Sequence, residues 1–303
     1  MDRVAYHKFW YWIRERQAIW HRRFKENLPP PWTKDKILRE FKFTNVFRNQ
    51  DRVTIDCHRQ IRDALADGET LDLILFRVCL YRLFNWPNTY QMLKDLGSAW
   101  DEREARKRIA RALTEKKQVY TGAYIVPNLG RTDPKHFLMT RTLSQIWKRK
   151  EDIVEAIKND NTLEGACAIL RAYESVGPFI SYEIVTDLRW TPLLKNADDI
   201  MSWANPGPGA KRGLDRIFRG IGFTKGGRPD RKYRRPNVKQ YVEEMRKLLV
   251  ASASIDTLGK DFKRLEMRDI EHSLCEFDKY MRVLRGEGRP RSKYHADHHS
   301  QRE

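Results

Sequence analysis

No apolar stretch of the sequence approaches the roughly 18 residues that a membrane-spanning helix needs, and the charged, aromatic N-terminus does not look like a cleavable signal peptide. We therefore expect a cytoplasmic protein with no membrane partner. Cysteine is scarce as well. The four cysteines are far apart and form no CxxC pair, which disfavours a zinc site and a cysteine-ligated iron–sulfur cluster. We expect reduced, mostly buried thiols and neither a metal nor a cofactor, although the tail histidines His295, His298 and His299 leave metal capture open as an alternative.

The glycine-rich loops of nucleotide-binding enzymes are also missing. No GxGxxG occurs, and the stretch Asn205-Pro-Gly-Pro-Gly-Ala-Lys-Arg212 has neither the spacing nor the Ser/Thr of a Walker A loop. A kinase reading of these residues therefore has no support. The stretch instead opens a helix with glycines and two cations, Lys211 and Arg212, a composition that suits an anion at the start of a helix.

Strand patterns are nearly absent. The short β-branched segment 121–127 has no partner strand elsewhere in the chain, so we expect a loop there. Helical spacing of apolar residues instead predicts about ten helices and an all-α fold. The expected helices include residues 3–26, a helix starting near residue 51, 71–86, 101–117, 141–158, 162–173, 237–250 and 268–285.

Three segments follow from this pattern. Residues 1–32 form an aromatic, basic helix with a proline linker, residues 33–286 form a single helical domain, and residues 287–303 form a basic, histidine-containing tail. An aromatic and basic helix is able to stack on nucleic-acid bases, but docking of its aromatic side chains on the core is the favoured interpretation.

Positive charge is in clear excess, with 59 Lys and Arg against 41 Asp and Glu and a formal net charge of +18. Such an excess favours a polyanionic partner, because Lys and Arg release counterions when they bind phosphates. The excess is densest between Lys211 and Lys239, which contains 11 Lys and Arg against two Asp. We expect a DNA-binding loop here, formed by Arg228, Arg231, Lys232, Arg234 and Arg235.

Residues 162–190 read as a helix, a tight turn and a second helix. Val176, Gly177, Pro178 and Phe179 form the turn, with a glycine for the bend and a proline suited to the first helical position. The backbone N–H groups at the start of the second helix are suited to a phosphate. The pattern resembles the helix-hairpin-helix of base-excision DNA glycosylases, which predicts a contact between this turn and DNA.

A second group of polar residues precedes the helix that starts near residue 51. The group consists of Thr44, Asn45, Arg48, Asp51 and Arg52. These residues either form a structural network that caps the helix, or Asn45, Arg48, Asp51 and Arg52 bind a phosphate-bearing substrate.

Several motifs together resemble one known family, the phage thymine-hypermodification proteins, described as α-glutamyl/putrescinyl thymine pyrophosphorylases, as amino acid:DNA transferases and as the 5-hydroxymethyluracil DNA kinase helical domain. The resemblance runs in order from about residue 40 to residue 294. It rests on the segments Phe41–Thr54, Thr121–Tyr124, Gly177–Asp187, Trp203–Gly213 and Asp269–Tyr280, of which the last is the most specific.

The resemblance implies a DNA-glycosylase-like helical fold and a different reaction. A separate kinase first phosphorylates 5-hydroxymethyluracil in DNA, and the transferase then replaces the (pyro)phosphate with the amine of a free amino acid or polyamine. Read against that chemistry, Lys211, Arg212, Arg48 and Arg52 are candidates to bind the leaving phosphate. Candidate acids and bases are Asp187, Asp199, Glu271, His272 and Glu276, and glycosylase topology points to Asp199 or its neighbour Asp198. A phage-encoded protein of this kind would act in the host cytoplasm.

Two alternatives remain open. The first is a monofunctional DNA glycosylase acting on a modified base, with Asp199 stabilising an oxocarbenium-like centre. A lyase that uses a lysine near the hairpin is disfavoured, because residues 161–194 contain no Lys. The second alternative is a non-catalytic module in which the hairpin and the basic loop bind DNA and the acids are structural.

Overall fold

The computed structural model describes residues 1–121, 133–253, 264–288, 290 and 292–294. Across these residues the chain is helical, with two isolated β-bridges, Phe41–Lys293 and Phe223–Pro229, in place of strands. The predicted all-α class is therefore confirmed. In the described part of the chain no helix is both long enough and apolar enough to cross a membrane.

Contacts between residues divide the chain into two compact units. Unit 1 combines Met1–Asp51 with Met201–Glu303, and unit 2 covers Arg52–Ile200. Within unit 1 the N-terminal helix packs against helices from the C-terminal part of the chain. The sequence-based division at residues 33 and 286 stays a prediction.

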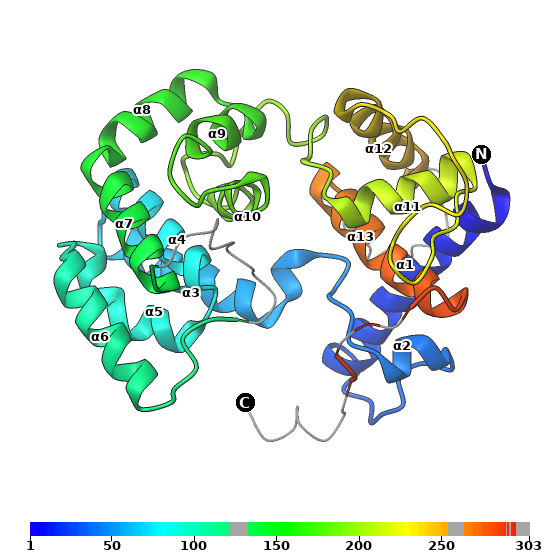
Figure 1. Cartoon of the computed structure of the whole chain (residues 1–303), viewed down its shortest axis with the longest axis horizontal. Coiled ribbons are helices and arrows are strands. Elements are labelled where there is room, and N and C mark those ends of the chain that lie inside the picture. Colours follow the sequence, from blue (N-terminus) through cyan, green and yellow to red (C-terminus); the bar gives the residue numbers. More distant parts are fainter. Residues whose placement is uncertain (122–132, 254–263, 289, 291, 295–303) are drawn as a thin grey trace. The chain divides into compact units, whose positions relative to one another are not determined.

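Unit 2 is built around one nearly all-apolar helix, α4 (Leu71–Phe84), whose residues from Ile74 to Phe84 are buried with the exception of Arg77. Around it pack α3 (Arg52–Ala66), α7 (Lys135–Lys148), α8 (Lys150–Asp160) and α10 (Pro178–Leu188) (Figure 1). The remaining helices of the unit are α5 (Pro87–Leu93), the 3₁₀ turn η2 (Lys94–Gly97), α6 (Glu102–Thr114) and α9 (Leu163–Leu170). A helix buried on all sides is the expected consequence of a segment without a polar face.

Unit 1 contains α1 (Arg3–Phe24), α2 (Lys36–Glu40), the 3₁₀ turn η1 (Arg48–Gln50), α11 (Pro208–Arg219), α12 (Val238–Ser252) and α13 (Met267–Leu284). Its centre is the pair α11 and α13, which lie side by side in Figure 1. Two glycines of α11, Gly209 and Gly213, face α13: a Cβ atom on Gly213 would lie 2.6 Å from the carbonyl oxygen of Leu274, and one on Gly209 would lie 2.5 Å from the Sγ atom of Cys275. The glycines thus allow the two backbones to approach closely.

Most of the helices predicted from the sequence are confirmed, with two differences. The expected helix over 141–158 is two helices, α7 and α8, which meet at Arg149. The aromatic N-terminal helix is only partly docked on the core: Phe9, Trp10 and Trp12 are buried, whereas Phe24 at its end is 52% exposed. The expected loop at 121–127, apart from Thr121, and the tail histidines lie outside the described residues. Of the tail, Ser292 and Tyr294 pair with the backbone of residues 40–42.

The close contact of α11 with α13 makes a stability prediction. The variant Gly213→Ala should lower the free energy of unfolding by about 1–3 kcal/mol, because the added methyl group meets a backbone oxygen that cannot move without shifting α13. Urea unfolding followed by circular dichroism measures this loss. Gly226→Ala is the matched control, since a Cβ atom there has its nearest neighbour at 3.9 Å. Equal stability of the two variants would contradict the proposed reason for the glycines.

Candidate functional site

The most specific motif of the sequence, Asp269–Tyr280, lies on α13 within unit 1. Its first carboxylate, Asp269, accepts a hydrogen bond from the backbone N–H of Glu266 at 2.9 Å and belongs to the capping box that starts the helix. The next charged residues, Glu271 and Glu276, are both buried. The helix therefore carries acidic side chains into the protein and not into solvent, which calls for specific partners.

His272 and Glu276 both reach the segment that precedes η1. The imidazole Nε2 atom of His272 is hydrogen-bonded to the hydroxyl group of Thr44. The carboxylate of Glu276 accepts a hydrogen bond from the backbone N–H of Thr44 at 3.1 Å and forms an ion pair with Lys279 at 2.6 Å. One residue of the 41–54 motif thus binds two residues of the 269–280 motif.

The neighbouring residues extend this contact into a network. Asn45 donates to the carboxylate of Asp51 at 2.9 Å from both its backbone and its side chain, and Asp51 lies 3.4 Å from the guanidinium of Arg48. Arg16 of α1 donates to the side chain of Asn45 at 2.7 Å and to the carbonyl oxygen of Thr44 at 3.0 Å. We call the set the α13 cluster; its members are Arg16, Thr44, Asn45, Arg48, Asp51, Arg268, His272, Glu276 and Lys279.

Cations dominate the electrostatics of the α13 cluster. The pKa of His272 lies well below its ordinary value, first because the imidazole is buried and then because Arg48, Arg268, Lys279 and Arg16 disfavour a further positive charge. Burial raises the pKa of Asp51, against the opposing effect of Arg48. His272 is therefore neutral at neutral pH, in surroundings that favour an added anion.

Glu271 faces the start of α11. Its carboxylate accepts a hydrogen bond from the backbone N–H of Gly207, the N-cap residue of that helix, at 3.1 Å. Desolvation by the surrounding protein atoms, and then Glu271 and Glu276, raise the pKa of Cys275, so this cysteine stays in the thiol form. The glycine-rich segment thus starts a helix, as predicted, and the glycines at 209 and 213 are explained by the approach of α13.

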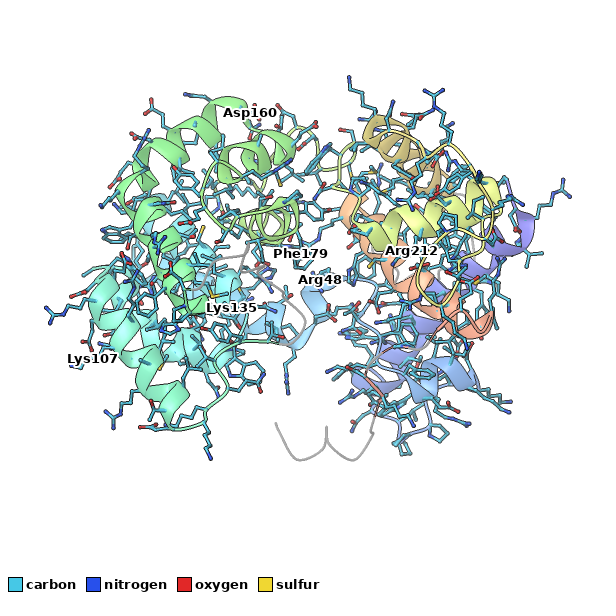
Figure 2. All side chains as sticks on the ribbon, viewed as in Figure 1. Arg48, Lys107, Lys135, Asp160, Phe179 and Arg212 are labelled. Atoms are coloured by element: carbon cyan, nitrogen blue, oxygen red, sulfur yellow. The ribbon has the colours of Figure 1, made fainter. Side chains whose placement is uncertain are left out.

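The two cations predicted to bind phosphate at the start of α11 already have partners. Arg212 forms an ion pair with the buried Asp278 at 2.7 Å, and Arg216 bonds the other oxygen of that carboxylate at 3.0 Å. Lys211 lies over the ring of Tyr241, 5.8 Å from its centre. Arg48 and Arg212, both labelled in Figure 2, belong to unit 1. Arg48 is a member of the α13 cluster, whereas Arg212 is not. Arg52 is exposed at the first position of α3, in unit 2.

Asp199, the acid that glycosylase topology indicates, contacts the start of α9. Its two carboxylate oxygens accept hydrogen bonds from the backbone N–H groups of Leu163 at 2.7 Å and Glu164 at 3.0 Å. These N–H groups belong to the first turn of the helix and have no partner within it. A capping role accounts for this carboxylate, and its catalytic role stays a prediction.

Asp187 is the centre of a buried charge network in unit 2. Its carboxylate, 1% exposed, forms an ion pair with both Nε and Nη2 of the buried Arg82 and lies 3.0 Å from Nε2 of His58. Arg82 is held in turn by Asn85 at 2.8 Å and Thr54 at 3.2 Å. Arg82 and His58 hold the pKa of Asp187 well below its ordinary value despite burial, so the carboxylate is charged and a poor proton acceptor.

The turn between α9 and α10 differs in detail from the sequence-based interpretation. The residue with a left-handed backbone is Ser175, with φ of 61°, whereas Gly177 has φ of −77° and caps α10 without a side chain. Val176 is buried and holds the turn, while Gly177, Pro178 and Phe179 are exposed and the position of a Cβ atom on Gly177 is open. Figure 2 shows Phe179, 48% exposed, at the start of α10. An open backbone beside an exposed ring permits the close approach of a ligand.

The predicted DNA-binding loop is exposed and well anchored. Arg228, Arg231, Lys232, Arg234 and Arg235 all face solvent. Tyr233, in their midst, donates a hydrogen bond to the buried carboxylate of Asp215, which also accepts one from Tyr241 at 3.1 Å. The hydrogen bond of Tyr233 therefore anchors the loop to the core of unit 1, while its cationic side chains remain exposed.

A sequence profile of the family described as 5-hmdU DNA kinase, helical domain, matches residues 3–289. The chain belongs to this family. The 5-hmdU DNA kinase of Bacillus phage SP10 is 27% identical over 291 residues, which make up 88% of this chain and 43% of the phage protein. The chain thus spans less than half the length of this curated relative. No solved structure matches the chain significantly.

Membership of the 5-hmdU DNA kinase helical-domain family confirms the resemblance that the motifs indicated. The glycosylase-like fold and the helix-hairpin-helix stay predictions, since the structure shows two helices joined by a turn. Sequence reasoning missed Arg16, Arg268 and Lys279 in the α13 cluster, and Arg82 and His58 around Asp187. The signal for Arg82 was a charged residue in the interior of the most apolar helix, where a charge requires a buried partner.

Removal of the charge at Asp187 should unfold unit 2 more readily. Asp187→Asn leaves the guanidinium of Arg82 buried without its counter-charge, for which we expect a loss of about 3–5 kcal/mol in the free energy of unfolding. Thermal and urea unfolding measure the loss. Asp63→Asn, an exposed carboxylate on α3, is the matched control and should leave stability unchanged. A stable Asp187→Asn protein would show that the pair is not required for folding.

Proposed function

We propose that this chain is a transferase that hypermodifies thymine bases in DNA. It replaces the phosphate or pyrophosphate on a phosphorylated 5-hydroxymethyluracil with the amine of an amino acid or polyamine. The observation that carries the proposal is the α13 cluster, where the half-buried imidazole of His272 is hydrogen-bonded to Thr44 and lies among four cations. The family and the phage relative, named for a DNA kinase of the same base, support 5-hydroxymethyluracil DNA as the substrate class.

The matched region argues against phosphorylation as the reaction of this chain. A P-loop kinase needs a glycine-rich loop followed by Lys and Ser/Thr to bind the phosphates of ATP, and the present 303 residues contain no such loop. The phage kinase extends well beyond the part that this chain matches. In the proposed reaction a kinase activity that lies outside the matched residues supplies the phosphorylated base, and this chain consumes it.

The reaction is a substitution at the methylene carbon on C5 of the pyrimidine. The amine nitrogen forms a bond to this carbon as the bond from the carbon to the (pyro)phosphate oxygen breaks. The electron pair of the broken bond leaves with the phosphate, and the amine loses one proton to a base. Catalysis thus needs cations beside the leaving group and a proton acceptor beside the amine.

The cations of the α13 cluster meet the first need. Desolvation lowers the pKa of His272 most, and Arg48, Arg268, Lys279 and Arg16 lower it further. The positive field of these four side chains stabilises a phosphate anion as its charge grows. Arg48 and Arg268 are able to bind phosphate oxygens in a bidentate manner, whereas Lys279 acts as a point charge.

His272 meets the second need. A base must be unprotonated before it takes a proton, and the lowered pKa of His272 keeps its imidazole neutral. When a phosphate dianion occupies the cluster, it offsets the cations and raises the pKa of His272, so the imidazole becomes a stronger base when substrate is bound. The carboxylate of Glu276 bonds the backbone of Thr44 and pairs with Lys279. It thereby holds the 41–54 segment against α13, next to His272.

DNA binding is assigned to two further surfaces. The exposed Gly177–Phe179 turn at the start of α10 offers backbone N–H groups to a phosphate and a ring to a base, in the manner of a helix-hairpin-helix. The basic loop with Arg234 and Arg235 adds non-specific attraction. A base attacked at its methylene group has to leave the stack, as in other enzymes that act on bases.

One incubation separates the proposed transferase from its alternatives. The protein is mixed with phosphorylated 5-hydroxymethyluracil DNA and a set of amino acids and polyamines, and the nucleosides are then analysed by mass spectrometry. An amine adduct of the thymidine supports the transferase. An abasic site would establish a glycosylase, and unchanged DNA would leave a binding module.

The role of His272 makes a kinetic prediction. His272→Gln should lower kcat by at least about 100-fold, the usual contribution of a general base, with DNA affinity retained. In the unaltered protein the acid limb of kcat/KM should lie below pH 6.5, because the pKa of the imidazole is lowered from that value. His7→Gln, an exposed histidine of α1, is the matched control. Normal turnover in His272→Gln would remove this residue from the reaction.

The basic loop makes a prediction about salt. Changing Arg234 and Arg235 to Gln should weaken DNA binding on all sequences and reduce the slope of log K against log salt by about 2. Fluorescence anisotropy at several salt concentrations measures the slope. Arg103→Gln/Lys107→Gln, which neutralises two exposed cations of α6 (Lys107 is marked in Figure 2), should leave it unchanged. An unaltered slope in the loop variant would exclude the loop from the DNA interface.

A further inference from the structure

The C-terminal half of α1 carries aromatic rings that are not used by the core. The first half of the helix buries Phe9, Trp10 and Trp12. About two turns beyond Trp12, Trp20 is half-buried and Phe24 is 52% exposed, and their rings lie 5.8 Å apart. A half-buried ring followed one turn later by an exposed ring is unusual in a helix whose first half buries three large aromatic side chains.

Two segments distant in sequence add rings to the same surface. Trp32, in the proline-rich connector, lies 6.3 Å from the ring of Tyr294 in an edge-to-face arrangement. Trp32 is fixed by a hydrogen bond from its Nε1 atom to the carbonyl oxygen of Leu28 at 2.6 Å, and Tyr294 is tied by its backbone to Glu40 at 3.0 Å. The rings thus have defined positions.

Cations are interleaved with these rings. The guanidinium of Arg23 lies 4.6 Å from the ring centre of Phe24 and 5.2 Å from that of Trp32, and the ammonium of Lys25 lies 5.7 Å from that of Trp20. Arg23 also donates to the hydroxyl of Tyr294 at 3.4 Å. We call this surface the aromatic ladder; it consists of Trp20, Arg23, Phe24, Lys25, Trp32 and Tyr294.

The aromatic ladder continues from the α13 cluster along one face of α1. Arg16, Trp20 and Phe24 are spaced four residues apart, so they lie on adjacent turns of the same face. Arg16 is the member of the α13 cluster that α1 supplies. The ladder therefore begins roughly 6 Å, one helical turn, from a phosphate-binding cation and extends away from it.

We propose that the aromatic ladder binds single-stranded nucleic acid by stacking unpaired bases on its rings while Arg23 and Lys25 contact the phosphates. Alternating rings and cations suit this partner, because every base has a stacking face and every linkage has a negative charge. A duplex hides those faces within its own stack, so the ladder prefers single strands. The inference extends the proposed function to a second surface, and its binding assay needs no transfer reaction.

The test measures affinity for an unmodified, fluorescein-labelled oligothymidylate by anisotropy, with a duplex of the same length for comparison. Trp20→Leu/Phe24→Leu removes the rings but keeps apolar bulk, so the helix is retained, as circular dichroism verifies. We expect at least tenfold weaker binding of the single strand and little change for the duplex. Leu28→Ala, an exposed aliphatic residue of the same surface, is the matched control and should bind normally.

Three outcomes decide the matter. Selective loss of single-strand binding supports the ladder, even if no amine adduct is ever found, so the two proposals fail separately. Equal affinity of the variant and the unaltered protein overturns the inference. Loss of binding to vesicles containing an anionic lipid, with oligothymidylate binding intact, would likewise overturn it and assign the surface to a membrane.

Discussion

The close contact between α11 and α13 is the constraint on which the rest of unit 1 depends. Gly209 and Gly213 remove the side chains that would hold the two helices apart. At this distance Asp278 of α13 reaches both Arg212 and Arg216 of α11, and Glu271 reaches the backbone of Gly207. These contacts fix the position of α13. They also fix His272 and Glu276, the two residues of α13 that bond Thr44.

Buried charge is managed in different ways in the two units. In unit 2, Arg82 and Asp187 neutralise each other, and neutral side chains and His58 satisfy the remaining polar atoms. The α13 cluster is different, because its cations surround a histidine that stays neutral. An ion pair of equal and opposite charges needs no ligand, whereas a cluster with more cations than carboxylates attracts an anion. The balance of charge, rather than the number of charges, distinguishes the structural network around Asp187 from the candidate site in the α13 cluster.

Sequence patterns predicted much of the secondary structure and little of the chemistry of individual residues. The apolar run 71–84 and the proline at 178 identified α4 and the start of α10, because both signals are local. The glycine at 177 was assigned to the bend, yet Ser175 adopts the left-handed conformation. The glycines of 207–213 were interpreted through an anion, although two of them serve a helix–helix contact. Glycines at the start of a helix look the same in the sequence whether they approach an anion or a second helix. Only the structure shows which of the two lies next to them.

The sequence by itself determined the helical class, the family and the basic character of the 211–239 segment, because these depend on composition, periodicity and motifs along the chain. The tertiary structure decided which charges meet. Asp187 joined Arg82, 105 positions before it, and Asp199 joined the start of α9. Thr44 joined His272 and Glu276 of α13, more than 200 positions later. Partners of this kind are separated by many residues, and the free energy of a buried charge depends on what surrounds it in space.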